Sequence, residues 1–402
     1  MANTYLTISM ITREALRVLS NNLAFTRGAT TEYNDKFGVE GAKIGTTVNV
    51  RKPPRYVGRT GTAISIENAT ETQVAVTLDT QFGVDLSFSS ADLKLSIDDF
   101  SKRFIRPAIA TIANKIDNDG LKLYKKVYNT VGAQGTVPNA LLTYLNAGVK
   151  LDDEATPMDG QRNLVITPQM QATIVDALKG LFQSATAIAD QYRSGQMGVA
   201  AGFNWFMDQN CATHTIGAHG GTPLVNGASQ TGASLVTDGW TASTAVLKEG
   251  DVITLAGVNA VNPQSRESTG VLRQFVVTAN VTSDGSGNAT IAISPSITTG
   301  TGFQTVTGSP ADNAAITVSG PASATARVGL AHHPDAFTLV TADLPVPNGT
   351  DMAARANDPD SGLSIRLVRD YDITTDLFPC RLDVLYGWAA LRPELAVRVW
   401  GS

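Results

Sequence analysis

Histidine and cysteine are the residue types in this chain best suited to catalysis or metal binding, and both are scarce: the 402 residues include four histidines and two cysteines. His214 and His219 lie five residues apart in a glycine-rich stretch without an acidic residue between them, which is not a metal-ligand spacing. His332 and His333 could bind a metal, but we expect a surface turn or a strand end where backbone groups satisfy the rings. We therefore predict no catalytic residues, no cofactor and no metal.

Short catalytic motifs are also missing. The sequence contains no GxGxxG, Walker A loop, GxSxG or HExxH. Residues 283–288 (SDGSGN) look like a calcium loop without its closing glutamate, and we interpret them as a hairpin turn. Cys211 and Cys380 form no CxxC pair, so we expect two buried, reduced thiols, which suits a cytoplasmic protein.

The net charge of −5 gives no indication of general nucleic-acid binding. Residues 1–130 contain 17 basic and 13 acidic side chains, whereas the remainder contains 14 and 23. This asymmetry either helps identical subunits to pack or is an ordinary difference between domains. We expect no signal peptide, and no apolar run approaches the roughly 20 residues that a membrane span needs.

The first half of the chain predicts helices around an extended β-arm. Residues 7–21 predict a short amphipathic helix, and the β-arm follows at 45–89. Its first strand is expected at 47–50 and a single long second strand at 72–88. The connection contains two prolines, which exclude it from the centre of a sheet, and it is basic. An ordinary surface hairpin is the alternative interpretation.

Further helices and strands follow the β-arm. We expect a long helix from Pro107 to about Tyr128, weakened at Gly120, then a helix at 139–151. A buried strand at 163–167 should lead into a helix with Pro168 at its first position. Further expected elements are a helix at 183–195 and a strand at 202–208.

The composition changes near residue 212, where charges become rare and Gly, Thr, Ser and Ala dominate to about residue 325. Short apolar strands at 252–255, 275–279, 290–293 and 315–318 predict a small inserted β-barrel, and a disordered linker is the alternative. After it we expect a strand at 337–340, a polar loop at 348–361 and a strand at 363–368. Residues 381–388 alternate like a strand, and a corner at 392–394 leads to a last strand.

Three segments resemble the major capsid proteins of tailed bacteriophages. They are SSADLKLSIDDFSKRFIRPAIATIANKI (89–116), LKEGDVITLAGVNAV (247–261) and CRLDVLYGWAALRPELAV (380–397). The order of elements is similar to the HK97-like fold and looks closest to the P22-type coat proteins, which have an inserted β-barrel. The resemblance implies an α+β fold and a major capsid protein that self-assembles into an icosahedral shell enclosing viral DNA, without catalysis.

The resemblance also implies a division into domains. An N-terminal arm (1–44) would precede an E-loop (45–89) and a P-domain with a long spine helix (90–150). The A-domain would comprise 151–211 and 327–346, separated by the inserted barrel at 212–326. Residues 347–402 would return to the P-domain and end in the C-terminal strand.

The implied partners are other copies of the chain, in hexamers and pentamers, with a scaffolding protein and a portal protein. Double-stranded DNA would be enclosed without sequence-specific binding, no membrane would be involved, and assembly would take place in the host cytoplasm. The E-loop would lie over a neighbouring subunit. The candidate interface residues on it are Arg51, Lys52, Arg55, Arg59, Glu67 and Glu71.

Two other functions stay open at this point. The Thr-, Ser- and Gly-rich insert would suit a β-rich adhesin or carbohydrate-binding surface module, although the cysteines and the missing signal peptide argue against it. An enzyme with an unrecognised site around His332 and His333 is the third hypothesis.

Overall fold

The computed structural model describes residues 16, 19, 23–31, 45–58, 60–64, 66, 71–89, 106–178, 198–300, 302–357 and 363–401. The chain divides into two compact units. The first comprises residues 1–50, 73–120 and 337–391, and the second comprises residues 51–72, 121–336 and 392–402. The helices expected at 7–21 and 183–195 lie outside the described residues, except that Leu16 and Leu19 are helical and buried.

The first unit is built mainly from strands and one helix. In chain order these are η1 (Thr26–Gly28), β1 (Thr47–Arg51), β2 (Gln73–Thr77), β3 (Thr80–Ser89), α4 (Arg106–Leu121), β16 (Phe337–Thr341), β17 (Met352–Asn357), β18 (Ser364–Arg369) and β19 (Leu377–Ala390). The strand order of its large sheet is β16-β19-β18-β17, with β3 also paired to β19, and β1 pairs with β2 alone.

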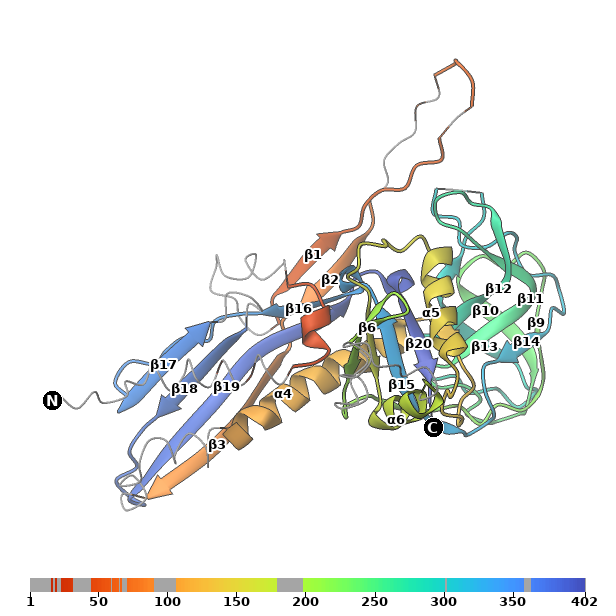
Figure 1. The fold of residues 1–402 in the computed structure, drawn as a ribbon. Helices are drawn as coiled ribbons and strands as arrows, with labels where there is room; N and C mark the ends of the chain where they lie inside the picture. Colours follow the sequence, from red (N-terminus) through yellow and green to blue (C-terminus); the bar gives the residue numbers. More distant parts are fainter. Residues whose placement is uncertain are drawn as a thin grey trace. The chain divides into compact units, whose positions relative to one another are not determined.

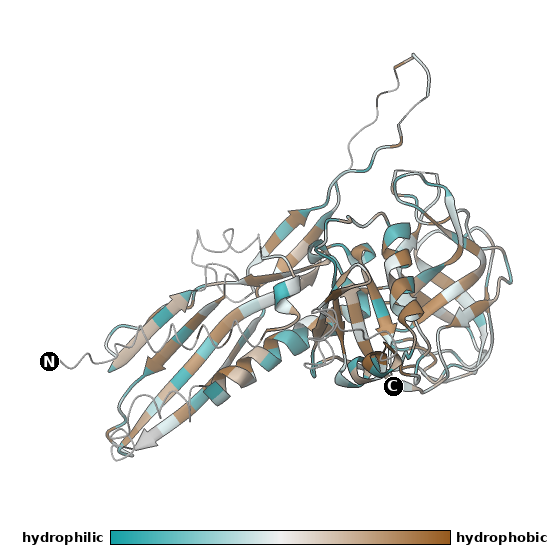
Figure 2. Cartoon of the chain, viewed as in Figure 1, coloured by the Kyte–Doolittle hydropathy of each residue, from teal (hydrophilic) through white to brown (hydrophobic). Residues whose placement is uncertain are grey.

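Helix α4 packs along one face of this sheet (Figure 1). Ile109, Ile112 and Ile116 are fully buried at helical spacing. They contact residues that alternate along β19, including Leu382 and Val384, which confirms the alternation expected there. Apolar and polar residues can be followed in alternation along β19 in Figure 2. Burial of this shared apolar surface holds helix and sheet together.

Two expectations about this unit were wrong. The run at 72–88 is two strands, β2 and β3, which separate at Leu78-Asp79 because β2 pairs with β1 and β3 pairs with β19. The polar loop expected at 348–361 contains strand β17, which pairs along its whole length with β18. The hydrogen bonds with β18 make this segment a strand, although its own polar sequence does not predict one.

The expected long helix is shorter at its C-terminal end. The α-helix α4 ends at Leu121, and a 3-10 helix, η4 (Lys122–Lys126), continues the chain. Val127 is then extended, and its N–H donates to the carbonyl of Tyr124. A 3-10 turn commonly ends an α-helix in this way.

The second unit contains the remaining elements. They are η4, β4 (Thr130–Val131), α5 (Leu141–Asp153), β5 (Asn163–Ile166), α6 (Pro168–Leu178), β6 (Val199–Ala200), β7 (Phe203–Met207), β8 (Thr213–Thr215), β9 (Gly221–Val225), β10 (Gly232–Trp240), β11 (Val252–Val261), β12 (Ser268–Val277), β13 (Ala289–Ile297), β14 (Ile316–Val318), β15 (Thr325–His332), η6 (Pro334–Ala336), η7 (Pro393–Leu395) and β20 (Ala396–Trp400).

A mixed sheet with two helices forms one part of this unit. Its strand order is β4-β20-β15-β5-β7-β6, and β8 also pairs with β15. Tyr144 of α5 and Met170 and Ile174 of α6 are fully buried against Val397 and Val399 of β20. Pro168 is the first residue of α6, as the sequence predicts, because proline at this position loses no helical hydrogen bond. The C-terminal strand is therefore part of this core.

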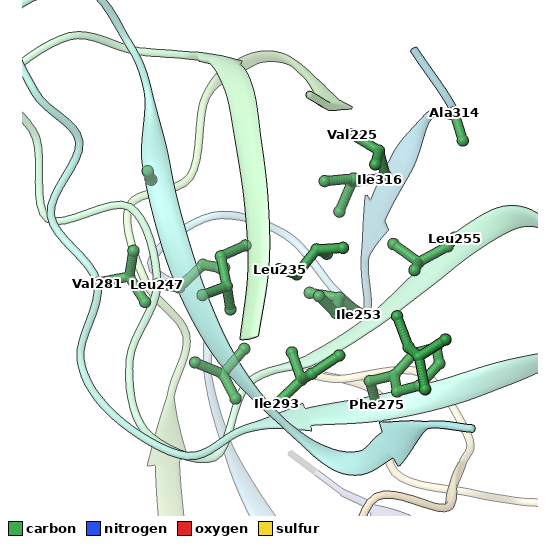
Figure 3. Packing of buried hydrophobic residues seen from close by; sticks show 14 of the residues in the cluster. Val225, Leu235, Leu247, Ile253, Leu255, Phe275, Val281, Ile293, Ala314 and Ile316 are labelled. Carbon is green, nitrogen blue, oxygen red and sulfur yellow. The ribbon is translucent and has the colours of Figure 1, made fainter. Parts of the chain in front are cut away.

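A six-stranded antiparallel sheet forms the other part, with the order β14-β11-β12-β13-β10-β9. Edge strand β9 meets the residues that lead into edge strand β14, because the Val225 N–H donates to the carbonyl of Ala314 at 3.0 Å and Leu224 forms an isolated bridge with Ala315. Apolar side chains from several strands fill the interior, among them Leu235, Ile253 and Phe275 (Figure 3). Strands β11 to β14 overlap the four expected ones, whereas β9 and β10 were not foreseen, since GTPLV and GASLVTDGW have little apolar alternation.

Candidate interaction site on the β-arm

The described residues of the β-arm present both charge and apolar surface. Arg51 Nη1 lies 3.0 Å from Glu71 Oε2, and the two side chains are 70 % and 45 % exposed. Ile64 and Ile66 are 84 % and 88 % exposed. The described part of the β-arm therefore offers both exposed charges and exposed isoleucines to a partner.

The base of the β-arm is held within the second unit. Arg55 Nη2 lies 3.4 Å from Glu394 Oε1, and its guanidinium lies over the Phe303 ring at 5.8 Å. Arg266, from the turn between β11 and β12, donates to the carbonyl oxygens of Tyr56 and Val57 at 2.9 and 2.8 Å. These contacts hold the residues that begin the arm.

Lys52 and Arg55 of the predicted interface therefore lie close to Arg392 and Glu394, 340 residues away in the sequence. Burial lowers the pKa of Lys52; Glu394 opposes this effect, and the cations Arg392 and Arg55 add to it. In the sequence, the corner at 392–394 is recognisable only as a turn, and nothing local places it beside the arm. Arg59 and Glu67 lie outside the described residues.

The histidines have structural roles. His214 Nε2 lies 2.8 Å from Asp251 Oδ1 and His214 Nδ1 lies 2.9 Å from the Tyr124 hydroxyl, with the His214 and Asp251 side chains only 3 % and 0 % exposed. The two ring nitrogens of His214 are thus both within hydrogen-bond distance of a partner. No substrate can reach this buried chain of hydrogen bonds. It links η4 and β8 to Asp251, the residue before β11, instead.

His332 ends strand β15 with its Nδ1 3.3 Å from the carbonyl oxygen of His333, which confirms the expected strand end satisfied by backbone. Both rings are buried, so the alternative of a surface turn was wrong. Burial lowers the pKa of His332 to about 4, so this ring is neutral near pH 7. His333 Nε2 lies 3.1 Å from Asp159 Oδ2. Among the described residues, no group of three or more His, Cys, Asp or Glu side chains could hold a metal ion.

Both cysteines are buried free thiols, as predicted. Burial raises the pKa of each thiol, to about 11 for Cys380. In the part of the chain that the structure describes, no helix combines the length and apolar character of a membrane span.

Comparison with known proteins identifies the family. The family model described as "P22 coat protein - gene protein 5" matches residues 49–401. The chain belongs to the P22 coat protein family. The coat protein has a capsid-like fold of mixed strands with few helices, and it is a structural, capsid-forming protein of a phage virion and not an enzyme. The enzyme hypothesis is thereby wrong, and the adhesin hypothesis is not favoured.

Solved structures from several phages are similar to this chain. The capsid of Ralstonia phage GP4 is 9 % identical over 93 % of this chain and 86 % of its own, with a TM-score of 0.47. A structure from Mycobacterium phage Che8 is 13 % identical over 94 % and 90 %, with a TM-score of 0.43. The CUS-3 coat protein I-domain is 25 % identical over 25 % of this chain and 96 % of its own, with a TM-score of 0.19. No curated protein sequence matches the coat protein.

Proposed function

We propose that the coat protein assembles through hexamers and pentamers into an icosahedral shell that encloses double-stranded DNA without reading its sequence. The observation that supports this most is that a single coat-protein family pattern spans residues 49–401. That span includes nearly all of the β-arm, most of the first unit, the second unit and the terminal strands. A scaffolding protein and a portal protein are the proposed assembly partners, in the host cytoplasm.

The proposed subunit has the HK97-like arrangement. In this arrangement α4 is the P-domain spine, β1 and β2 with their connection are the E-loop, and the sheet around β5 and β15 is the A-domain. Strands β9 to β14 are the inserted β-barrel. The hydrogen bond from Val225 to Ala314 and the apolar interior support a closed barrel that folds as a unit.

The β-arm is the proposed contact with a neighbouring subunit, through Arg51, Lys52, Arg55, Arg59, Glu67 and Glu71. Arg51 and Glu71 support this assignment because both are exposed and each could exchange its partner for one on a neighbour. An exposed ion pair contributes only about 0–1 kcal/mol. Repetition over many copies makes such weak contacts sufficient and still reversible, which lets a growing shell correct its errors.

The test is electron microscopy with sedimentation of the chain expressed with and without a candidate scaffolding protein. Uniform round shells or tubes support the proposal, whereas a persistent monomer or small oligomer would count against it. Replacing Arg51, Lys52, Arg55 and Arg59 with alanine should leave the subunit folded and reduce shell yield. Lys248→Ala, at an exposed lysine outside the arm, is the control. Full shell yield from the quadruple variant at low and high salt would show that the arm charges are not used.

A further inference from the structure

A cleft of about 670 Å³ lies in the second unit, between the base of the β-arm and the six-stranded sheet. Its lining includes residues 52–56 of the arm, residues 392–394, and residues 294–296, 298 and 303–305 of the sheet and its loops. The cleft has the volume that a short peptide segment or a small ligand needs.

Positive charge exceeds negative charge in this cleft. Lys52, Arg55, Arg273 and Arg392 line it, and the only acids among its lining residues are Glu154 and Glu394. Glu394 lies 3.4 Å from Arg55 and 3.5 Å from Arg392, so one carboxylate serves two guanidinium groups with Lys52 close by. In a chain with a net charge of −5, two uncompensated cations in one cleft are a site for a negatively charged group.

Two of the residues that line the cleft, Arg273 and Glu154, form a buried ion pair. Arg273 is 3 % exposed, and its Nη1 lies 2.5 Å from Glu154 Oε1. Among the described residues, the buried Nε of Arg273 has no hydrogen-bond partner. Buried nitrogens of this kind ordinarily have an acceptor, and a ligand in the cleft can supply one.

Apolar side chains also line the cleft, and they favour a peptide over a free phosphate or a nucleic-acid backbone. Pro53, Pro54, Pro295 and Phe303 lie along it, and Tyr56 is 57 % exposed at its edge. A free phosphate or a nucleic-acid backbone would leave these rings in water. A peptide with acidic and apolar side chains would cover both kinds of surface.

One segment of this chain has that chemistry. Residues 370–376 (DYDITTD) form the turn between β18 and β19 and contain three aspartates. Ile373 is 83 % exposed and Tyr371 is 43 % exposed. The turn is held in shape because the Thr374 N–H and the Thr375 hydroxyl donate to the Asp372 carboxylate at 2.9 and 2.8 Å. A preformed turn loses little conformational entropy on binding.

We propose that the cleft binds the acidic turn 370–376 of a second copy of the coat protein. The aspartates would face Lys52, Arg55 and Arg392, and Ile373 or Tyr371 would cover the prolines and Phe303. This inference rests on the proposed assembly, because it names a contact between subunits of the shell. For Lys52 and Arg55, two of the residues proposed to contact a neighbouring subunit, it names the segment of the neighbour that they meet.

A binding assay tests the cleft without requiring assembly. A fluorescently labelled peptide of residues 369–377, cyclised through added terminal cysteines, is titrated with the full chain, and anisotropy is measured. Lys52→Glu combined with Arg392→Glu should weaken binding at least about tenfold, since like charges then oppose the aspartates. Lys248→Glu makes the same kind of change outside the cleft and should leave affinity unchanged. If circular dichroism shows that the double variant is misfolded, Lys52→Gln replaces it and should weaken binding by a smaller factor.

Equal binding by the charge-reversed variant and the native chain would overturn the proposal. Inorganic phosphate, titrated alone by calorimetry, is the second probe. Phosphate binding in the cleft without peptide binding would also overturn it, because the cleft would then be a site for a free anion.

Assembled particles provide the second test. Shells assembled from equal amounts of ¹⁴N- and ¹⁵N-labelled chains are treated with a carbodiimide, which joins a lysine amine to a carboxylate in contact with it. Mass spectrometry should find Lys52 joined to Asp370, Asp372 or Asp376 in pairs of one light and one heavy peptide. Particles in which Lys52 never couples to this turn on another copy would overturn the proposal. Peptide binding without any particles would contradict the proposed shell and support the cleft.

Discussion

Arg273 and Glu154 form an ion pair with Nη1 and Oε1 2.5 Å apart and side chains 4 % and 7 % exposed. Arg273 lies on β12 of the six-stranded sheet, and Glu154 directly follows α5. The guanidinium also lies over the ring of Tyr128 at 4.5 Å. Two buried charges that satisfy each other therefore fix the six-stranded sheet to the helix that packs on the mixed sheet.

Removing one member of this pair should destabilise the protein strongly. Glu154→Ala leaves Arg273 buried without its carboxylate, and we expect the free energy of unfolding to fall by about 3–5 kcal/mol. The double variant Glu154→Leu/Arg273→Met removes both charges and should lose less. Urea unfolding followed by tryptophan fluorescence measures both. A double variant less stable than Glu154→Ala would contradict this account of the pair.

The protein should be more stable with glycine at position 120 than with alanine, although this position lies within a helix. Alanine is favoured over glycine in helices by about 1 kcal/mol. A Cβ added at Gly120, however, would lie 2.7 Å from Phe25 Cε1 and 2.8 Å from Trp388 Cζ2. Overpacking of this kind costs typically about 1–3 kcal/mol, so Gly120→Ala should lower the midpoint of thermal unfolding. A raised midpoint would mean that the two rings move aside freely.

Asp117 should anchor the segment before η1 to α4. It is 1 % exposed, and its carboxylate accepts hydrogen bonds from the Ala24 N–H at 2.7 Å and from the N–H and hydroxyl of Thr26 at 3.1 and 2.6 Å. Asp117→Ala leaves these buried donors unsatisfied, so we expect a loss of roughly 3 kcal/mol or more. Hydrogen exchange should show faster exchange at residues 24–26 than in the native chain. Asp119→Ala, two residues along the helix, is the matched control and should leave exchange at residues 24–26 unchanged.

His332 should make stability depend on pH. Its pKa is about 4 in the folded protein, against about 6.5 in the unfolded chain, so the unfolded state binds more protons between these values. The stability that the neutral His332 ring contributes is complete above pH 6.5. It is lost as the pH falls towards 4, by up to about 3 kcal/mol. The difference in unfolding free energy between the native chain and His332→Asn should therefore shrink over that range. A constant difference for His332→Asn would refute the prediction.

The β-arm with its basic connection could be predicted from the sequence, whereas its contact with a neighbouring subunit came from the resemblance to phage capsid proteins and stays a prediction. The cleft beside the arm could not be predicted from the sequence. Arg273, Arg392 and Glu394 have ordinary sequence surroundings, and nothing local indicates that they approach Lys52 and Arg55. The three aspartates of the acidic turn are visible in the sequence. They indicate a binding segment only once the structure shows that Ile373, beside them, is exposed.

The sequence by itself determined the elements with strong local periodicity. The alternation in β19, the proline that begins α6 and the apolar strands β11 to β14 follow from interactions between residues close in the chain, and the family pattern gave the function. Tertiary structure decided the division of 72–88 into β2 and β3, the strand β17 and the end of α4 at Leu121. Strand pairing and side-chain burial join residues hundreds of positions apart, so their energies are not encoded in any local pattern.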